Sequence, residues 1–79
     1  MGEVKPNRTL NVMGLYCPEP VFRTKLEIQS MNIGEILEVI ADDPMAEIDI
    51  KNWVKRNGQE LLEFSKDENK LRFLIRKVK

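Results

Sequence analysis

Histidine is absent from this 79-residue chain, and cysteine occurs once, at position 17. Without histidine the chain cannot build a Cys–His couple, a Ser–His–Asp arrangement or a histidine-bearing zinc site. A single cysteine excludes an internal disulfide, and a lone thiol in a small domain is typical of a reducing compartment. Any thiol chemistry of this chain must therefore involve Cys17.

Long apolar segments and an excess of charge are also missing. No segment approaches the roughly 20 apolar residues of a membrane span, and residues 1–6 lack the apolar core of a signal peptide. The 13 basic and 13 acidic residues cancel, so no overall field draws the chain to nucleic acid or to a membrane. The sequence predicts a cytoplasmic protein with no direct nucleic-acid binding and no membrane association.

The short chain limits what the fold can enclose. A domain of this size buries only about 60–65% of the surface that its unfolded chain exposes, so a deep pocket beside the core is not expected. We expect a disordered lead over residues 1–7 and one domain over residues 8–79, with its function on the surface or shared with a partner. Nothing in the sequence requires more than a monomer.

Hydrophobic spacing predicts the element order β-α-β-α-β-β. An aspartate cap and Pro44 start the second helix, and Phe22 and Leu26 are expected to widen the apolar side of the first. A right-handed crossover places both helices on one face of a mixed four-stranded sheet, a two-layer α/β sandwich. The predicted strands are 8–13, 36–41, 60–65 and 70–78, and the predicted helices are 18–31 and 44–56.

Three further features have an ordinary structural interpretation beside a functional one. Asp42 and Asp43 resemble paired catalytic carboxylates, but aspartate before proline at a helix start is common capping. Trp53 is expected in the core rather than as a platform for bases. Arg72 and Arg76 alternate along the last strand, which is typical of a solvated face.

Cys17 stands in the segment Cys17-Pro18-Glu19-Pro20, where the first helix begins. A residue before proline is pushed out of the α region, so Cys17 should lie at or next to the cap, with Pro18 in the first helical position. As the cap, its sulfur would accept a hydrogen bond from the Glu19 amide, and the helix dipole would favour the thiolate. The Glu19 carboxylate opposes this. The alternative is that Cys17 is a small, buried hydrophobic residue.

The segment from Gly14 to Pro20, Gly-Leu-Tyr-Cys-Pro-Glu-Pro, resembles the TusA/SirA-like sulfur-carrier family, which is marked by a Cys-Pro-x-Pro motif after a short first strand. Two departures lie near the site without disturbing the motif itself, where they could alter partner choice. Asn11 stands where many members have aspartate, and Tyr16 occupies a variable position that is often polar or basic. The resemblance covers nearly the whole chain from Leu10 onward and includes Gly34-Glu35, residues 41–44, Asp49-Ile50 and residues 73–77.

The resemblance implies a fold and a mechanism. The family's fold is a two-layer α/β sandwich, as expected from the element order. Cys17 would take up sulfur as a persulfide from a cysteine desulfurase or a similar donor protein and relay it to an acceptor protein. Pro18, Glu19 and Pro20 would shape the site, and the carrier needs no metal and no cofactor. In one branch the relay leads to tRNA thiolation; others serve sulfur oxidation, molybdenum-cofactor enzymes or membrane sulfur transporters.

Two other functions stay open at this point. Cys17 could be a redox-regulatory thiol, although the chain has no second cysteine to resolve an oxidised one. The chain could instead be a non-catalytic interaction domain in which Cys17 only packs. A carrier would act in sulfur transfer without being a self-contained catalyst, and only a carrier gains sulfur when incubated with a desulfurase and cysteine.

Overall fold

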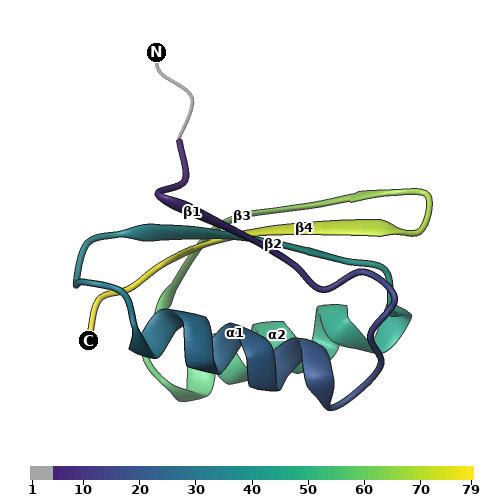
Figure 1. Ribbon diagram of the computed structural model, residues 1–79, viewed down its shortest axis with the longest axis horizontal. Helices are drawn as coiled ribbons and strands as arrows, with labels where there is room; N and C mark the ends of the chain where they lie inside the picture. Colours follow the sequence, from purple (N-terminus) through teal and green to yellow (C-terminus); the bar gives the residue numbers. More distant parts are fainter. Residues whose placement is uncertain (1–4) are drawn as a thin grey trace.

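The computed structural model describes residues 5–79 and confirms the predicted element order (Figure 1). No helix in this range is both long and apolar enough to cross a membrane. The elements are β1 (Arg8–Asn11), α1 (Glu19–Gln29), β2 (Ile36–Ala41), α2 (Pro44–Arg56), β3 (Glu60–Asp67) and β4 (Lys70–Arg76).

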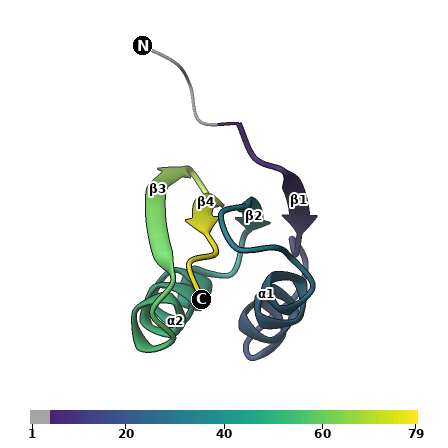
Figure 2. The same cartoon turned by 90° about the vertical axis from the view of Figure 1, so that its left-hand side faces the viewer.

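The four strands form one mixed sheet in the order β1-β2-β4-β3. β1 and β2 are parallel and are joined through α1, whereas β4 is antiparallel to both β2 and β3. Both helices lie against the same face of the sheet, as Figure 2 shows from the end of the molecule. The predicted two-layer sandwich with a mixed four-stranded sheet is therefore confirmed.

The core lies between the helices and the two central strands. Alternate residues of β2 and β4 face the helices, and Phe73 is fully buried with its ring centroid 5.0 Å from that of Phe64. Trp53 is half-buried and packs against this core from α2. The buried residues of these four elements are Pro20, Thr24, Ile28, Leu37, Val39, Ala41, Ala46, Ile50, Val54, Leu71, Phe73, Leu74 and Ile75.

The apolar side of α1 is narrower than the sequence predicted. Phe22 and Leu26 are about half exposed, so they do not widen the buried stripe. The buried positions of the helix are Pro20, Thr24 and Ile28, four residues apart. Residues two positions away from them point to the opposite side, because two steps rotate a helix by about 200°.

Several element boundaries differ from the prediction for local reasons. The side chain of Asn11 accepts a hydrogen bond from the backbone N of Met13 at 2.9 Å, and β1 ends at Asn11 instead of continuing to residue 13. The β3–β4 hairpin turns over Glu68 and Asn69, with Glu68 at φ 56°, so β3 extends further into the predicted turn, as far as Asp67. The predicted start of α2 after Asp43 and its end before Asn57-Gly58 are confirmed.

Hydrogen bonds tie both ends of the described chain to the rest of the domain. Residues 1–4 of the predicted lead lie outside the described residues. Asn7 belongs to that lead and forms two hydrogen bonds with Ile36 of β2. Its backbone N donates to the Ile36 carbonyl at 2.8 Å, and its side chain accepts from the Ile36 N at 2.7 Å. Near the C-terminus, the carbonyl of Lys77 accepts from Gly34 N at 2.7 Å, and its ammonium donates to the Met31 carbonyl at 2.7 Å.

The sheet face away from the helices carries a network of ion pairs. Arg72 binds Glu38 and lies 3.8 Å from Glu63, while Arg76 binds Glu60 on the neighbouring strand. Hydrogen bonding by Arg72 lowers the pKa of Glu38, helped by a hydrogen bond from Thr9. The face that was predicted to be solvated thus carries arginine and glutamate side chains that pair with one another.

Candidate functional site

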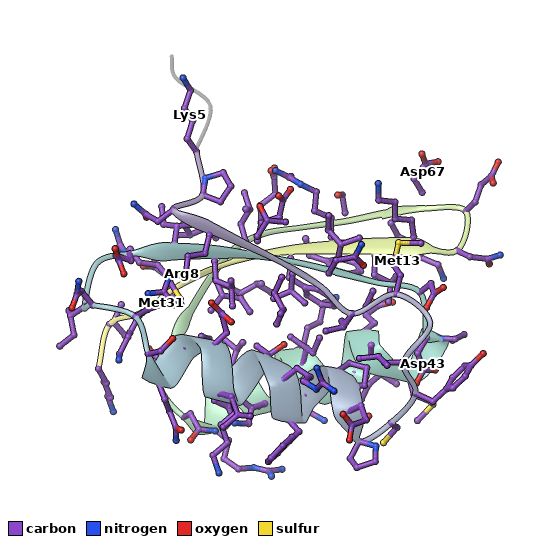
Figure 3. All side chains as sticks on the ribbon, in the orientation of Figure 1. Lys5, Arg8, Met13, Met31, Asp43 and Asp67 are labelled. Atoms are coloured by element: carbon purple, nitrogen blue, oxygen red, sulfur yellow. The ribbon has the colours of Figure 1, made fainter. Side chains whose placement is uncertain are left out.

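Two carboxylates at the start of α2 hold the backbone of the cysteine segment. The Asp42 side chain accepts a hydrogen bond from Gly14 N at 2.9 Å, and one oxygen of Asp43 accepts from Cys17 N at 2.9 Å. The other Asp43 oxygen accepts from Met45 N at 3.1 Å and caps α2. Figure 3 shows Asp43 at the right-hand end of the molecule. The capping interpretation is confirmed for Asp43, and both aspartates also fix the loop that carries Cys17.

Cys17 lies directly before the N-cap of α1, which confirms the predicted position at or next to the cap, but its sulfur does not cap the helix and Pro18 is not the first helical residue. The cap is Pro18, whose carbonyl accepts from Phe22 N at 3.0 Å, and no side chain caps this end. The Glu19 amide, the donor expected to bind the sulfur, instead donates to the Tyr16 carbonyl at 2.9 Å and closes a turn around a cis Cys17–Pro18 peptide bond. The thiol is exposed, so the interpretation of Cys17 as a buried hydrophobic residue is wrong.

The other two motif residues occupy different environments. Pro20 is buried under the first turn of α1, and its carbonyl accepts a hydrogen bond from the Thr24 hydroxyl at 2.7 Å. The burial of Pro20 therefore fixes the start of α1 against the core. The Glu19 carboxylate binds Arg23 one turn along the helix at 3.1 Å. Its charge is engaged by Arg23 rather than directed at the thiol.

The thiol is not activated in the free protein, contrary to the prediction. The pKa of Cys17 is raised, first by its hydrogen bond to the Asp49 carboxylate, then by partial loss of water contact and by the negative charges of Asp49 and Asp43. These carboxylates, and not Glu19, oppose the thiolate. Asp49 was not predicted as a site residue, although the Asp49-Ile50 pair belongs to the segments that resemble the sulfur-carrier family.

A cleft of about 250 Å³ opens beside Cys17, between the first turn of α1 and one stripe of α2. The α2 residues 49, 52, 53 and 56 share this stripe because they are spaced by three, four and seven positions. Within residues 5–79 no three histidine, cysteine or acidic side chains gather as metal ligands would. The cleft is lined by Cys17, Pro18, Val21, Asp49, Asn52, Trp53 and Arg56.

A small two-layer sandwich with one exposed cysteine, anchored by its own backbone beside a cleft, defines a class of protein that presents a thiol to other molecules. A family model described as Sulfurtransferase TusA matches residues 8–77, nearly all of the chain. The chain therefore belongs to the TusA/SirA-like sulfur-carrier family, as the resemblance of the Cys-Pro-x-Pro segment indicated.

Individual relatives agree with this assignment. A protein of Archaeoglobus fulgidus with a provisional description as a sulfur carrier is 49% identical over 73 residues, covering 91% of this chain and 95% of the relative. The sulfur carrier protein TusA of Allochromatium vinosum is 38% identical over 71 residues, covering 90% and 93%. The crystal structure of a SirA-like protein from Desulfitobacterium hafniense has the same fold, with a TM-score of 0.77 at 22% identity, covering 91% of this chain and 99% of that one.

Proposed function

We propose that this protein accepts sulfur on Cys17 as a persulfide from a donor protein such as a cysteine desulfurase, and relays it to an acceptor protein. The observation that carries the proposal is the exposed thiol on a segment whose backbone N is bound to Asp43 of α2. A thiol fixed in position and open to solvent suits exchange with a second protein. Membership of the sulfur-carrier family supports the same role.

The transfer needs no oxidant, because one S–S bond forms for each one that breaks. The Cys17 thiol loses its proton, and its sulfur attacks the outer sulfur of the donor persulfide. The S–S bond of the donor breaks, and the donor thiolate leaves and takes up a proton. Delivery repeats the step in the other direction, with an acceptor thiolate attacking the outer sulfur on Cys17.

The surface around the thiol favours a protein as donor and acceptor. Tyr16 beside the cysteine is 71% exposed, and Phe22 on α1 and Met45 and Ile48 on α2 are each about half exposed. Large apolar side chains gathered next to polar ones mark contact surfaces between proteins. The cleft by itself is small, so a macromolecular partner would use the surrounding surface as well.

The decisive experiment measures the intact mass of the protein after incubation with a purified cysteine desulfurase and cysteine. The wild type should gain one sulfur atom that a reducing thiol removes, and Cys17→Ser should gain none. Because Cys17 is exposed, the substitution should change the free energy of unfolding by no more than about 0.5 kcal/mol. A mixed disulfide in place of a persulfide would favour the redox alternative, and an unmodified wild type would overturn the carrier proposal.

We also propose that residues 8–79 act as one monomeric domain in the cytoplasm, with tRNA thiolation as the destination of the sulfur. Of these proposals, the destination of the sulfur is the one that the residues specify least. An acceptor must recognise the loaded carrier through contacts away from the persulfide sulfur. Deleting the gene and measuring thiolated uridine in tRNA by mass spectrometry would decide it: unchanged thiolation assigns the sulfur to another branch.

A further inference from the structure

The stripe of α2 that lines the cleft carries two charges that the fold does not use. Within residues 5–79 neither Asp49 nor Arg56 forms an ion pair, although both line the same cleft as Cys17. Asp49 lines the cleft together with Cys17, close enough for its negative charge to act on the thiol. Arg56 is seven residues further along α2, about 10 Å away at the rise of a helix.

Asp43 and Asp49 both approach Cys17 but differ in what they can do. Each oxygen of Asp43 accepts a backbone hydrogen bond, from Cys17 N and from Met45 N, and its side chain is buried. Asp43 is thus fully engaged in holding the fold. Asp49 is only half-buried and forms no ion pair with residues 5–79. Its carboxylate can therefore take a partner without any loss of structure.

We propose that Asp49 couples donor binding to the reactivity of Cys17: its carboxylate stands unpaired beside the thiol in the cleft and pairs with a cationic side chain of the donor that enters the cleft. The inference rests on the proposed function and specifies the donor's chemistry at this point of contact. A lysine or arginine paired with Asp49 neutralises the negative charge that opposes the thiolate. The Cys17 thiolate then forms while the donor persulfide that it attacks is bound.

The other charges near the thiol do not replace Asp49 in this role. Glu19 and Arg23 on α1 bind each other at 3.1 Å. Asp43 accepts from the backbone, and Arg56 lies at the far end of the stripe. Of the charged groups that α1 and α2 place around Cys17, only Asp49 combines contact with the thiol and a free carboxylate. A donor with an acidic contact point would meet this carboxylate as a like charge.

The first test uses the wild-type protein and three small disulfides that differ in charge: cystamine (cationic), 2-hydroxyethyl disulfide (neutral) and dithiodiglycolate (anionic). In each reaction the Cys17 thiolate attacks one sulfur, a mixed disulfide forms and the other half leaves as a thiolate. Rates are divided by those of 2-mercaptoethanol to remove the intrinsic reactivity of each probe. The normalised rate with cystamine should exceed that with dithiodiglycolate roughly tenfold, since opposite charges attract and like charges repel at short range.

The second test compares Asp49→Asn with the matched control Asp67→Asn, which makes the same change at the exposed end of β3. Asp49→Asn should reduce the cationic-to-anionic preference to roughly threefold or less, and Asp67→Asn should keep it. Alkylation by neutral iodoacetamide near pH 7 should be roughly threefold faster in Asp49→Asn, with its pH profile moved to lower pH. A structural role of Asp49 would not move this profile.

Equal normalised rates of the wild type with all three disulfides would overturn the proposal. So would an Asp49→Asn protein that keeps the charge preference and the pH profile of the wild type. The wild-type measurement stands by itself if the variant fails to fold. None of these rates depends on sulfur transfer, so a wild type that cannot be loaded by a desulfurase would reject the proposed function without changing the charge preference measured at Asp49.

Discussion

Charged side chains form ion pairs on the open face of the sheet, whereas two charged residues of the cleft beside Cys17 form none with residues 5–79. On the open face Arg72 is shared by Glu38 and Glu63, and Leu74, which alternates onto this face between Arg72 and Arg76, is only 1% exposed. At the cysteine end Asp49 and Arg56 line one cleft without pairing with any charged residue between positions 5 and 79.

This difference separates charges that stabilise the fold from charges that remain available to a partner. Cross-strand pairs shield the apolar atoms beneath them and fix the strands' register. Unpaired charges beside an exposed thiol contribute little to the stability of the fold. They remain available to pair with a molecule that enters the cleft. Three exposed large side chains, Tyr16, Met45 and Ile48, also lie at the cysteine end. Substitutions in the two regions should therefore affect different properties of the protein.

The largest effect is expected at Asp43, whose side chain accepts two backbone hydrogen bonds. Asp43→Ala removes the cap of α2 and leaves Cys17 N without its acceptor. It should lower the free energy of unfolding in urea by about 2–3 kcal/mol, since a cap contributes about 1 kcal/mol and an unpaired, part-buried donor costs a similar amount or more. Asp42→Ala, which loses only the bond to Gly14 N, should lose less than half as much. Equal losses would contradict the distinct role of Asp43.

A smaller effect is expected at Phe22, on transfer rather than on stability. Phe22→Ser should leave the unfolding free energy within about 0.5 kcal/mol, because the side chain is half exposed. Sulfur loading from a cysteine desulfurase should slow about fivefold, equivalent to about 1 kcal/mol of lost contact. Leu26→Ser, one turn further from the cysteine, is the control and should slow loading less. Loading of Phe22→Ser at the wild-type rate would show that the donor does not use this part of α1.

The smallest effect is expected from the open face, through pH. Because the pKa of Glu38 is lowered in the folded protein, its stabilisation is present above the ordinary glutamate pKa of about 4.3 and is lost as the pH falls through the folded value. Glu38→Gln should therefore be less stable than the wild type at neutral pH by about 0.5–1 kcal/mol, and the gap should close in acid. Urea unfolding over this pH range measures the gap, and loading should not change. A gap that grows in acid would contradict the assignment.

The elements of this fold could be predicted because local rules and the tertiary structure agree. β2 was placed correctly at both ends, since its apolar run is bounded by Gly34 and by the Asp-Asp-Pro cap. The errors occurred where side chains bind the backbone nearby, as at Asn11, or where an exposed apolar residue was assumed to be buried, as at Phe22. Spacing alone does not distinguish an apolar side chain that packs in the core from one that faces a partner.

The site was predictable in its nucleophile and not in its electrostatics. The Cys-Pro-x-Pro segment pointed to Cys17, but the turn that redirects the Glu19 amide to the Tyr16 carbonyl depends on a backbone geometry that spacing does not specify. Asp49 is 32 positions from Cys17 in the chain and reaches the thiol only because α1 and α2 pack side by side. A contact of this range requires the fold, so the opposing charge was assigned from sequence to the nearest carboxylate instead.

The bonds of Lys77 to the connection between α1 and β2 have a practical consequence for handling the protein. They hold the last residues beside Met31, at the end of α1, whereas Cys17 lies at its beginning, and Figure 1 shows the C-terminus on the side away from the start of α1. The 11 residues of the helix separate the two by about 16 Å. A fluorophore, an affinity handle or a resin attached after Lys79 should thus leave the thiol free, and an immobilised carrier could be loaded, washed and presented to candidate acceptors in turn.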